Sequence, residues 1–180
     1  IDADYYGRQV TPTSFTNSLP LPSGLEFINA KLARLYLDTS WAGIGGTEKT
    51  GLLRGFSLEF LTGLHPKFMG SANKYFTTYG EGDLAVMLTL TLEGNSDADA
   101  IFDLYQAGTE RALRLDMLGS QIGSGGVYTF RTDLYGYFEQ VVPLSSEVNG
   151  NNLHQALFVM MPDSSGNFLD IDIITNDDEI

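Results

Sequence analysis

The sequence contains no cysteine, few basic residues and no long apolar run. The absence of cysteine excludes a disulfide framework, a thiolate metal cluster and a cysteine nucleophile. No apolar run approaches the roughly 18 residues that a membrane span needs. The first residues also lack the basic and apolar regions of a signal peptide, so we expect a soluble chain. The only histidines, His65 and His154, are too few to favour a zinc site.

Basic residues are scarce mainly in the second part of the chain. The sequence has 10 Lys and Arg against 23 Asp and Glu, for a formal net charge of -13. Residues 1–74 hold seven basic and six acidic residues, whereas residues 75–180 hold three basic and 17 acidic residues. Such a negative surface repels phosphate, which disfavours stable binding to nucleic acid or to an anionic membrane. The charge serves either solubility or the passage of an anionic molecule that must not adhere.

Length and apolar content predict one folded domain with an extended arm. The chain has 180 residues, of which 43% are hydrophobic, and this is enough for a real core. Residues 1–24 contain three prolines among Thr, Ser and Asn, which indicates an extended N-terminal arm. We expect a single domain over 25–180 with a long loop at 63–83. A loop of that length is usually functional or held by a partner.

Alternating apolar residues predict most of the secondary structure. Residues 52–62 and 84–92 alternate with the period of half-buried strands, with Leu84 to Leu92 supplying one core face. Ser96 is a predicted N-cap for a helix over 97–107, which Gly108 ends. Further strands are predicted near 32–38, 111–117, 127–141, 153–161 and 168–174, with a polar loop over 143–152. This pattern predicts a mainly β fold: an antiparallel β-sandwich or barrel with one flanking α-helix near 97–107.

Sequence motifs that suggest binding chemistry are all better explained as turns. Residues 43–50 nearly match a phosphate-binding loop, but Glu48 replaces a required glycine and a strand follows where a helix is needed. Residues 163–167 imitate the start of a calcium loop, yet Phe168 stands where a glycine is required. The acidic pairs 97/99 and 170/172 fit a helix start and the solvent face of a strand. No local arrangement around either histidine suggests a catalytic triad.

Two alternative functions stay open, and aromatic residues suggest the first of them. Tyrosines and a tryptophan are candidates for a sugar-binding platform, although such residues are more often core or interface residues. They are Tyr5, Tyr6, Trp41, Tyr135 and Tyr137. A monomeric carbohydrate-binding or adhesin-type β-sandwich module is therefore one alternative. A hydrolase with a pocket that holds a titrating pair is the other.

Three consecutive segments resemble the tail tube (major tail) proteins of long-tailed bacteriophages. They are LYLDTSWAGIGGTEKT at 35–50, LRGFSLEF at 53–60 and TGLHPKF at 62–68. The later order of a strand, a helix, a hairpin and a final strand pair is also similar. The resemblance thus spans about residues 30–175. It lies in the order of the segments and in the kinds of residues they contain.

The resemblance implies a structural virion protein without enzymatic activity or cofactor. Its sandwich domains would form a barrel on oligomerisation, in hexameric rings that stack into a tube conducting genomic DNA during ejection. The implied partners are further copies of the chain, the tape measure and tail terminator proteins, and DNA as cargo that does not adhere. The implied location is the virion tail, assembled in the host cytoplasm and without a membrane.

Site residues follow from placing the predicted elements in such a tube. The candidates for an acidic lumen are polar or small residues on the faces opposite the core: Ser57, Glu59, Ala85, Thr89 and Thr91. The loop 63–83 and the arm match the segments that bridge neighbouring rings. The candidate inter-ring contacts in the loop are His65, Lys67, Phe68, Tyr75, Phe76 and Tyr79.

The three arginines after Lys74 carry a further expectation. An unpaired arginine in a DNA channel would hold phosphate through counterion release. We therefore expect Arg111, Arg114 and Arg131 to be turned toward a subunit interface or paired with an acid. The candidate acids are Glu110, Asp116 and Asp133.

Overall fold

The computed structural model of the chain describes residue 7 and residues 29–70, 74–123 and 125–175. These residues form nine strands, one α-helix and two short 3₁₀ turns. The 3₁₀ turns are η1 (Ala30–Leu32) and η2 (Trp41–Gly43), and the helix is α1 (Ser96–Gln106). The strands are β1 (Arg34–Asp38), β2 (Leu53–Leu61), β3 (His65–Lys67), β4 (Thr78–Gly80), β5 (Ala85–Glu93), β6 (Arg111–Ile122), β7 (Gly126–Val148), β8 (Asn151–Met160) and β9 (Leu169–Ile174).

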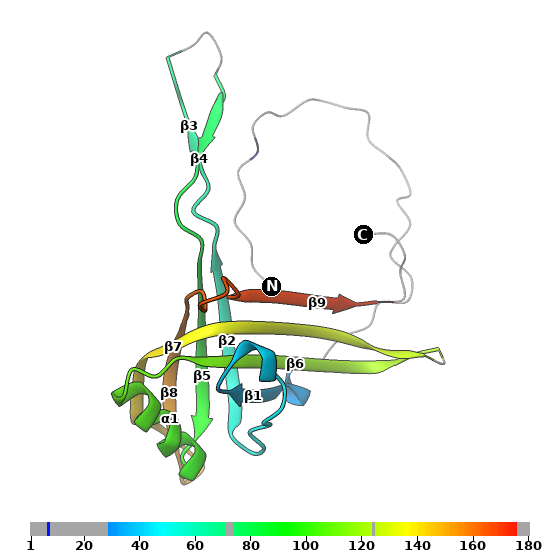
Figure 1. Cartoon of the computed structure of the whole chain (residues 1–180), viewed down its shortest axis with the longest axis vertical. Helices are drawn as coiled ribbons and strands as arrows, with labels where there is room; N and C mark the ends of the chain where they lie inside the picture. The colour runs from blue at the N-terminus through cyan, green and yellow to red at the C-terminus, as the bar shows by residue number, and fades with distance from the viewer. Residues whose placement is uncertain (1–6, 8–28, 71–73, 124, 176–180) are drawn as a thin grey trace. The chain divides into compact units, whose positions relative to one another are not determined.

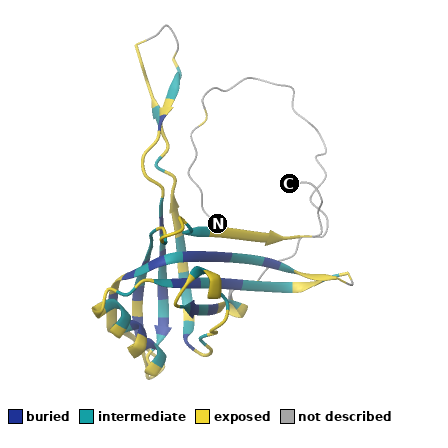
Figure 2. Cartoon of the chain, viewed as in Figure 1, coloured by how far each residue is buried: buried dark blue, intermediate teal, exposed yellow. Residues whose placement is uncertain are grey.

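Seven strands form one continuous antiparallel sheet that supplies both layers of the fold. Its order is β1-β6-β7-β8-β5-β2, and β9 pairs with the first part of β7. Figure 1 shows that β1, β6, β9 and the first part of β7 run across the direction of β2, β5 and β8. Buried residues gather where the two groups of strands cross (Figure 2). The predicted mainly β, antiparallel fold with one helix is confirmed.

Strand β7 joins the two layers because its pairing partners change at Gly136. This residue pairs with Arg111 of β6 on one side and with Met160 of β8 on the other. Before Gly136, β7 lies between β6 and β9, and after it β7 pairs with β8. A Cβ atom at Gly136 would collide with the carbonyl oxygen of Val159 and lie 2.9 Å from its carbonyl carbon. Only glycine therefore allows the close approach of β7 to β8 at this position.

The core lies between the layers and is closed at one end by α1. Alternate residues of β5, namely Val86, Leu88, Leu90 and Leu92, are at most 1% exposed, as the periodicity predicted. Ile101 of α1 is buried in the same cluster. Leu84 was also predicted on this face, but it precedes β5 and is 43% exposed.

The start of α1 corrects the predicted cap. Asn95, and not Ser96, is the N-cap residue, because its side-chain oxygen accepts hydrogen bonds from the N–H groups of Asp97 and Ala98 at 3.0 and 3.1 Å. The helix ends as predicted before Gly108, whose φ of 58° suits glycine after a helix terminus.

The predicted polar loop over 143–152 is wrong. Strand β7 continues to Val148 and β8 begins at Asn151, so only a two-residue turn joins them. Asn149 and Gly150 have φ angles of 54° and 84°, and Asn-Gly is the preferred pair for a tight hairpin turn with positive φ at both positions. The turn chemistry, rather than the polarity of the flanking residues, determined the structure here.

A second hairpin lies within the segment predicted as the loop 63–83. Strands β3 and β4 pair antiparallel, with His65 opposite Gly80. Gly63 and Gly82 close its base, because the N–H of Gly82 donates to the carbonyl of Gly63 at 2.9 Å. Gly63 has a φ of 68°, and a Cβ there would lie 2.6 Å from the carbonyl carbon of Gly82. The base of the segment is thus a hairpin, and the described residues 68–70 and 74–77 between its two strands lie in neither strand.

The described residues fall into two compact units. The hairpin belongs to a unit that includes residues 60–85, and the sheet and helix belong to a unit of residues 26–59 and 86–180. The predicted arm 1–24 lies outside the described residues apart from Gly7. The predicted single domain over 25–180 stays a prediction.

Replacing Gly136 with alanine is expected to lower the free energy of unfolding by about 2–3 kcal/mol, because the new methyl group must displace the β8 backbone. Urea denaturation of the two proteins measures this difference. Gly126→Ala is the matched control in the same strand, where an added Cβ meets no atom within 4 Å. The control is expected to stay within about 0.5 kcal/mol of the unmodified protein. Equal effects of the two substitutions would contradict the role of Gly136.

Candidate functional site

The four-strand part of the sheet, β7-β8-β5-β2, has one face that does not cover the core. Direct partners in a sheet share a face, so Thr89 lies with Leu157 and Gln140, and Thr91 lies with Gln155 and Val142. We call this surface the open face. Its described members are Ser57, Glu59, Met87, Thr89, Thr91, Tyr137, Gln140, Val142, Gln155, Leu157 and Val159. None of these residues is Lys or Arg, and the cation next to them, Arg54, lines a hollow with Thr91 and is paired with Glu93 at 2.6 Å.

The predicted lumen residues lie on strands that contribute to the open face. Ser57 and Glu59 are exposed, whereas Phe56 and Leu58 pack against the core. Phe60, which was expected on the same face as Phe56 and Leu58, is 39% exposed. Thr89 and Thr91 are half-buried on β5, and Ala85 is half-buried at its first residue. Whether these residues line a channel stays a prediction, taken up under the proposed function.

Sequence reasoning missed Gln140 as a member of the open face. A register shift lies between Phe138, which pairs with Phe158, and Gln140, which pairs with Leu157. The extra residue, Glu139, reverses the alternation, so that Phe138 and Val141 are both buried. Simple alternation from Phe138 would place Gln140 in the core. The one available signal was the pair of polar residues, Glu139 and Gln140, in succession within an apolar strand.

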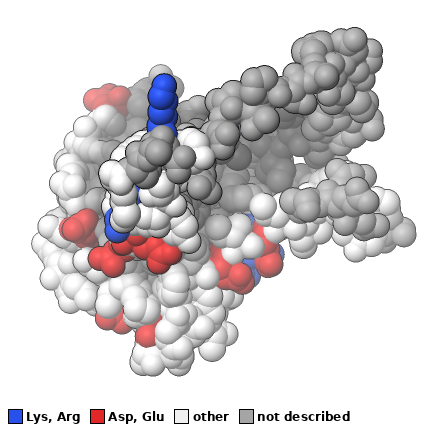
Figure 3. Space-filling model, turned by 90° about the horizontal axis from the view of Figure 1, so that it is seen from above, with Lys and Arg blue, Asp and Glu red and all other residues white. Residues whose placement is uncertain are grey.

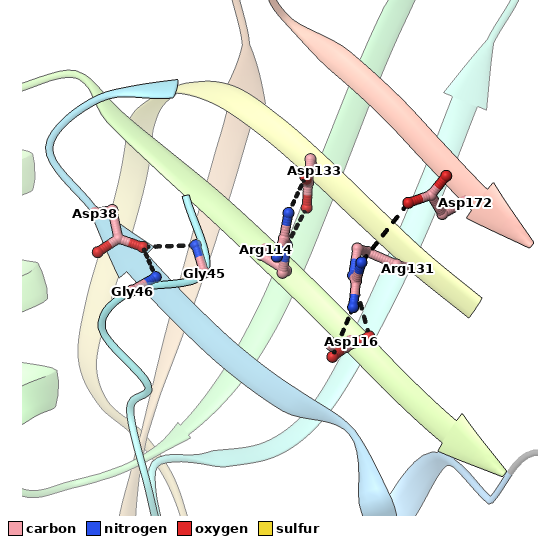
Figure 4. A network of polar contacts seen from close by, with 8 residues as sticks. All are labelled: Asp38, Gly45, Gly46, Arg114, Asp116, Arg131, Asp133 and Asp172. Atoms are coloured by element: carbon pink, nitrogen blue, oxygen red, sulfur yellow. Dashed lines mark hydrogen bonds and ion pairs between the residues drawn. The ribbon is translucent and has the colours of Figure 1, made fainter. Parts of the chain in front are cut away.

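The other part of the sheet carries ordered rows of charge on its outer side (Figure 4). Arg34, Asp116, Arg131 and Asp172 are successive direct partners across β1, β6, β7 and β9, so their charges alternate in sign. Figure 4 shows the last three of them. The Nε of Arg131 lies 3.4 Å from Asp116 Oδ1, and its Nη1 lies 3.7 Å from Asp172 Oδ2. The expected pairing of Arg131 with Asp116 is confirmed.

The neighbouring row contains a bidentate, largely buried ion pair. Arg114 donates to both carboxylate oxygens of Asp133 at 2.6 Å, and the two side chains are 20% and 7% exposed. The hydrogen bonds to Asp133 raise the pKa of Arg114 above its ordinary value. The expected pairing of Arg114 is thus confirmed, whereas Arg111 donates to the backbone carbonyl of Glu110 at 2.8 Å. Two of the three arginines in the acidic half are therefore neutralised by buried carboxylates.

The glycine-rich loop over 43–46 covers Arg114 and is held by Asp38. One carboxylate oxygen of Asp38 accepts from the N–H groups of Gly45 and Gly46 at 2.9 and 3.1 Å (Figure 4). Gly45 has a φ of 86°, and a Cβ there would overlap the guanidinium of Arg114. The backbone donors that would cradle a phosphate are thus occupied by the protein's own carboxylate. This geometry agrees with the conclusion from the sequence that residues 43–50 form a turn and not a phosphate-binding loop.

The remaining polar motifs are also local structural devices. Asp163 accepts from the N–H groups of Ser165 and Asn167 at 2.8 Å, which builds a turn. The side-chain bond from Asn167 lowers the pKa of Asp163. Among the described residues, no group of three His, Asp or Glu side chains is placed to hold a metal ion. No described helix is long and apolar enough to cross a membrane.

The predicted inter-ring residues gather on and around the β3–β4 hairpin. Phe68 and Tyr79 are 71% and 58% exposed, and Phe68 contacts Phe76 edge-on at a centroid distance of 6.2 Å. Leu64 and Met69 are also more than half exposed, which sequence reasoning did not single out. His65 and Lys67 are exposed on β3, and Tyr75 is half-buried. So many exposed large apolar side chains on one short element indicate an interaction surface.

Acidic side chains dominate the visible charge of the surface. On the face seen in Figure 3, acidic side chains cover more area than basic ones. Of the basic residues on the described sheet and helix unit, Lys49 pairs with Asp97 at 2.8 Å and Arg54 with Glu93 at 2.6 Å. Each of these ion pairs neutralises one basic and one acidic side chain. The acidic side chains are in excess, so negative charge remains at the surface.

Comparisons with solved structures show where this fold occurs. No protein-family model and no curated protein matches the sequence. The SPP1 tail tube chain, solved by solid-state NMR and cryo-electron microscopy, superposes with a TM-score of 0.51 at 15% identity, covering 82% of this chain and 81% of that chain. The chain of the cap that terminates the anti-feeding prophage tube superposes with a TM-score of 0.51 at 11% identity, covering 90% and 97%. The chain therefore has the tail tube protein fold.

Replacing Arg114 with methionine is expected to lower the free energy of unfolding by about 2–3 kcal/mol, because Asp133 then stays buried without its partner. Thermal or urea unfolding measures the loss. The double variant Arg114→Met/Asp133→Leu is expected to recover most of it, since no buried charge remains. Arg111→Met is the control, with an expected change within about 0.5 kcal/mol. Equal losses for Arg114→Met and Arg111→Met would show that the buried pair has no special role.

Proposed function

We propose that this chain is a structural subunit of a phage tail tube, in which hexameric rings stack into a hollow tube that conducts DNA. The observation that carries the proposal is the superposition on the SPP1 tail tube chain over about four-fifths of both chains. The role involves no reaction and no cofactor. The proposed partners are further copies of the chain and other proteins of the virion tail, including a tape measure and a terminator.

The edges of the four-strand sheet support ring formation. Among the described residues, β2 pairs only with β5, and the part of β7 after Gly136 pairs only with β8. No described strand therefore pairs with either outer edge of β7-β8-β5-β2, and α1 packs against β7. By contrast, residues 47–49 cover the edge of β1, because Thr47 accepts from Leu37 and Lys49 donates to Leu35 at 3.0 and 2.7 Å. Pairing of β2 with β7 of the next copy would close a ring of sheets.

The chemistry of the open face supports its role as the lumen wall. Such a wall must not hold phosphate, and each unpaired Lys or Arg would gain free energy by doing so. The open face has Glu59 and several hydroxyl and amide side chains among apolar ones, and the neighbouring Arg54 is paired with Glu93 at 2.6 Å. The arginines of β6 and β7 lie on the other part of the sheet, where Arg114 and Arg131 are paired with carboxylates. We therefore assign Ser57, Glu59, Ala85, Thr89 and Thr91 to the lumen.

Tubes carrying Glu59→Lys are expected to assemble but to retain duplex DNA about tenfold more strongly at low salt, with release as salt rises. Co-sedimentation of DNA with preassembled tubes measures the retention across a salt series. Asp103→Lys makes the same charge change on the exposed surface of α1 and is the matched control. If both variants retain DNA equally at every salt concentration, Glu59 does not line the channel.

The hairpin supplies the proposed contact between rings, and its removal provides the test of tube formation. We expect the purified chain to form rings and tubes at high concentration, as seen by negative-stain electron microscopy. Deletion of residues 66–80 is expected to abolish tubes and to spare the fold, because the Gly63–Gly82 hydrogen bond already holds the base of the hairpin together. Circular dichroism and unfolding check the fold of the variant. A deletion variant that forms normal tubes would refute the assignment of the hairpin.

A further inference from the structure

The β3–β4 hairpin has one basic side and one apolar side. His65 and Lys67 alternate with Pro66 along β3, so they point to the opposite side from Pro66. Tyr79 is the direct partner of Pro66 and shares its side. Lys67 is exposed and forms no ion pair within the described residues. The hairpin therefore presents a positive charge on one side and a 58% exposed tyrosine on the other.

Strand β9 shows the complementary pattern. Its sequence alternates between Asp170 and Asp172 on one side and Ile171 and Ile173 on the other. Asp170 is exposed and Asp172 is 54% exposed, and the two isoleucines are 39% and 55% exposed. Within the described part of the chain, β9 pairs with β7 alone, so its other edge is open. An open edge gives a partner access to both sides of the strand at once.

We propose that the hairpin of one copy docks along the open edge of β9 in a second copy. Lys67 then lies beside the carboxylate of Asp170, and Tyr79 and Phe68 cover Ile171 and Ile173. The inference rests on the proposed tube function and names the surface that receives the hairpin. Opposite charge on one side and exposed apolar area on the other make the two surfaces complementary.

A second copy is the occupant because the chain itself carries both complementary surfaces. A contact between two different patches of the same protein is heterologous, and it continues from copy to copy when its rotation does not close into a ring. Stacking of rings requires a contact of this kind. Pro66 lacks an N–H donor, so β3 does not add to β9 as a complete strand and the contact depends on side chains.

Cysteine cross-linking tests this contact directly, because the natural chain has no cysteine. Phe68→Cys and Ile173→Cys are made as two separate proteins, mixed in equal amounts and treated with a short bismaleimide. Only contacts between copies give the product that joins the two variants. We expect this product to be about tenfold more abundant than that from Phe68→Cys mixed with Leu144→Cys, whose position on β7 is 65% exposed. Equal yields from the two mixtures overturn the proposal.

Charge reversal gives an independent test of the same pair. Lys67→Glu and Asp170→Lys are each expected to raise the concentration needed for stacking about tenfold, because like charges then face each other. The double variant is expected to restore stacking, since the two charges have exchanged places. Lys31→Glu and Asp103→Lys are matched controls with the same charge changes at other exposed positions. Single variants that stack like these controls, or a double variant that is not restored, overturn the proposal.

Electron microscopy of the cross-linked samples separates this inference from the proposed function. If rings or tubes form without the Phe68–Ile173 product, the result supports the tube function and overturns the docking to β9. If the cross-linked product forms without rings or tubes, the result supports the docking and overturns the tube function. The absence of both in a folded protein at high concentration overturns both.

Discussion

The close approach of two strands at Gly136 is the constraint on which the rest of the fold depends. Because β7 belongs to both layers, its bend determines how β6 and β9 cross over β5 and β8. The bend is possible because glycine leaves room for the carbonyl of Val159. A single continuous sheet thus provides two layers around one core, without the separate sheets of an ordinary sandwich. After Gly136, β7 has β8 as its one strand partner among the described residues.

The fold separates its charges between the two parts of the sheet. Arginines of β6 and β7 lie on the outer side of one part, where carboxylates on neighbouring strands neutralise them. Beside the open face of the other part, Arg54 is likewise paired, with Glu93. A half-chain with 17 acidic and three basic residues supplies the excess of negative charge, but the sheet decides which side receives the few cations. This separation is what a surface requires if DNA is to pass it without binding.

The elements that were predicted correctly have strong local signals. Strand β5 has uninterrupted alternation, and α1 has Asp97 and Asp99 in its first turn, which favour a helix start, and ends before Gly108. The errors occurred where a short-range signal was misjudged or where the register was irregular. The Asn149–Gly150 turn contradicts the predicted loop, and the residue inserted at Glu139 reverses the alternation of β7. The hairpin within 63–83 was missed because its strands have three residues each.

The sequence by itself determined the secondary structure class, the buried faces of β2 and β5, and the acidic excess of the second half, because these depend on composition and on neighbours along the chain. Only the tertiary structure decided that Arg114 meets Asp133 and that Asp38 holds the glycine-rich loop, since these partners come from different strands or from opposite ends of a loop. It also decided which edges stay open, because an edge is defined by the order of strands in the sheet. That order depends on pairings between distant segments, and β1 and β6 pair across more than 70 residues. No local pattern in the sequence records such a pairing.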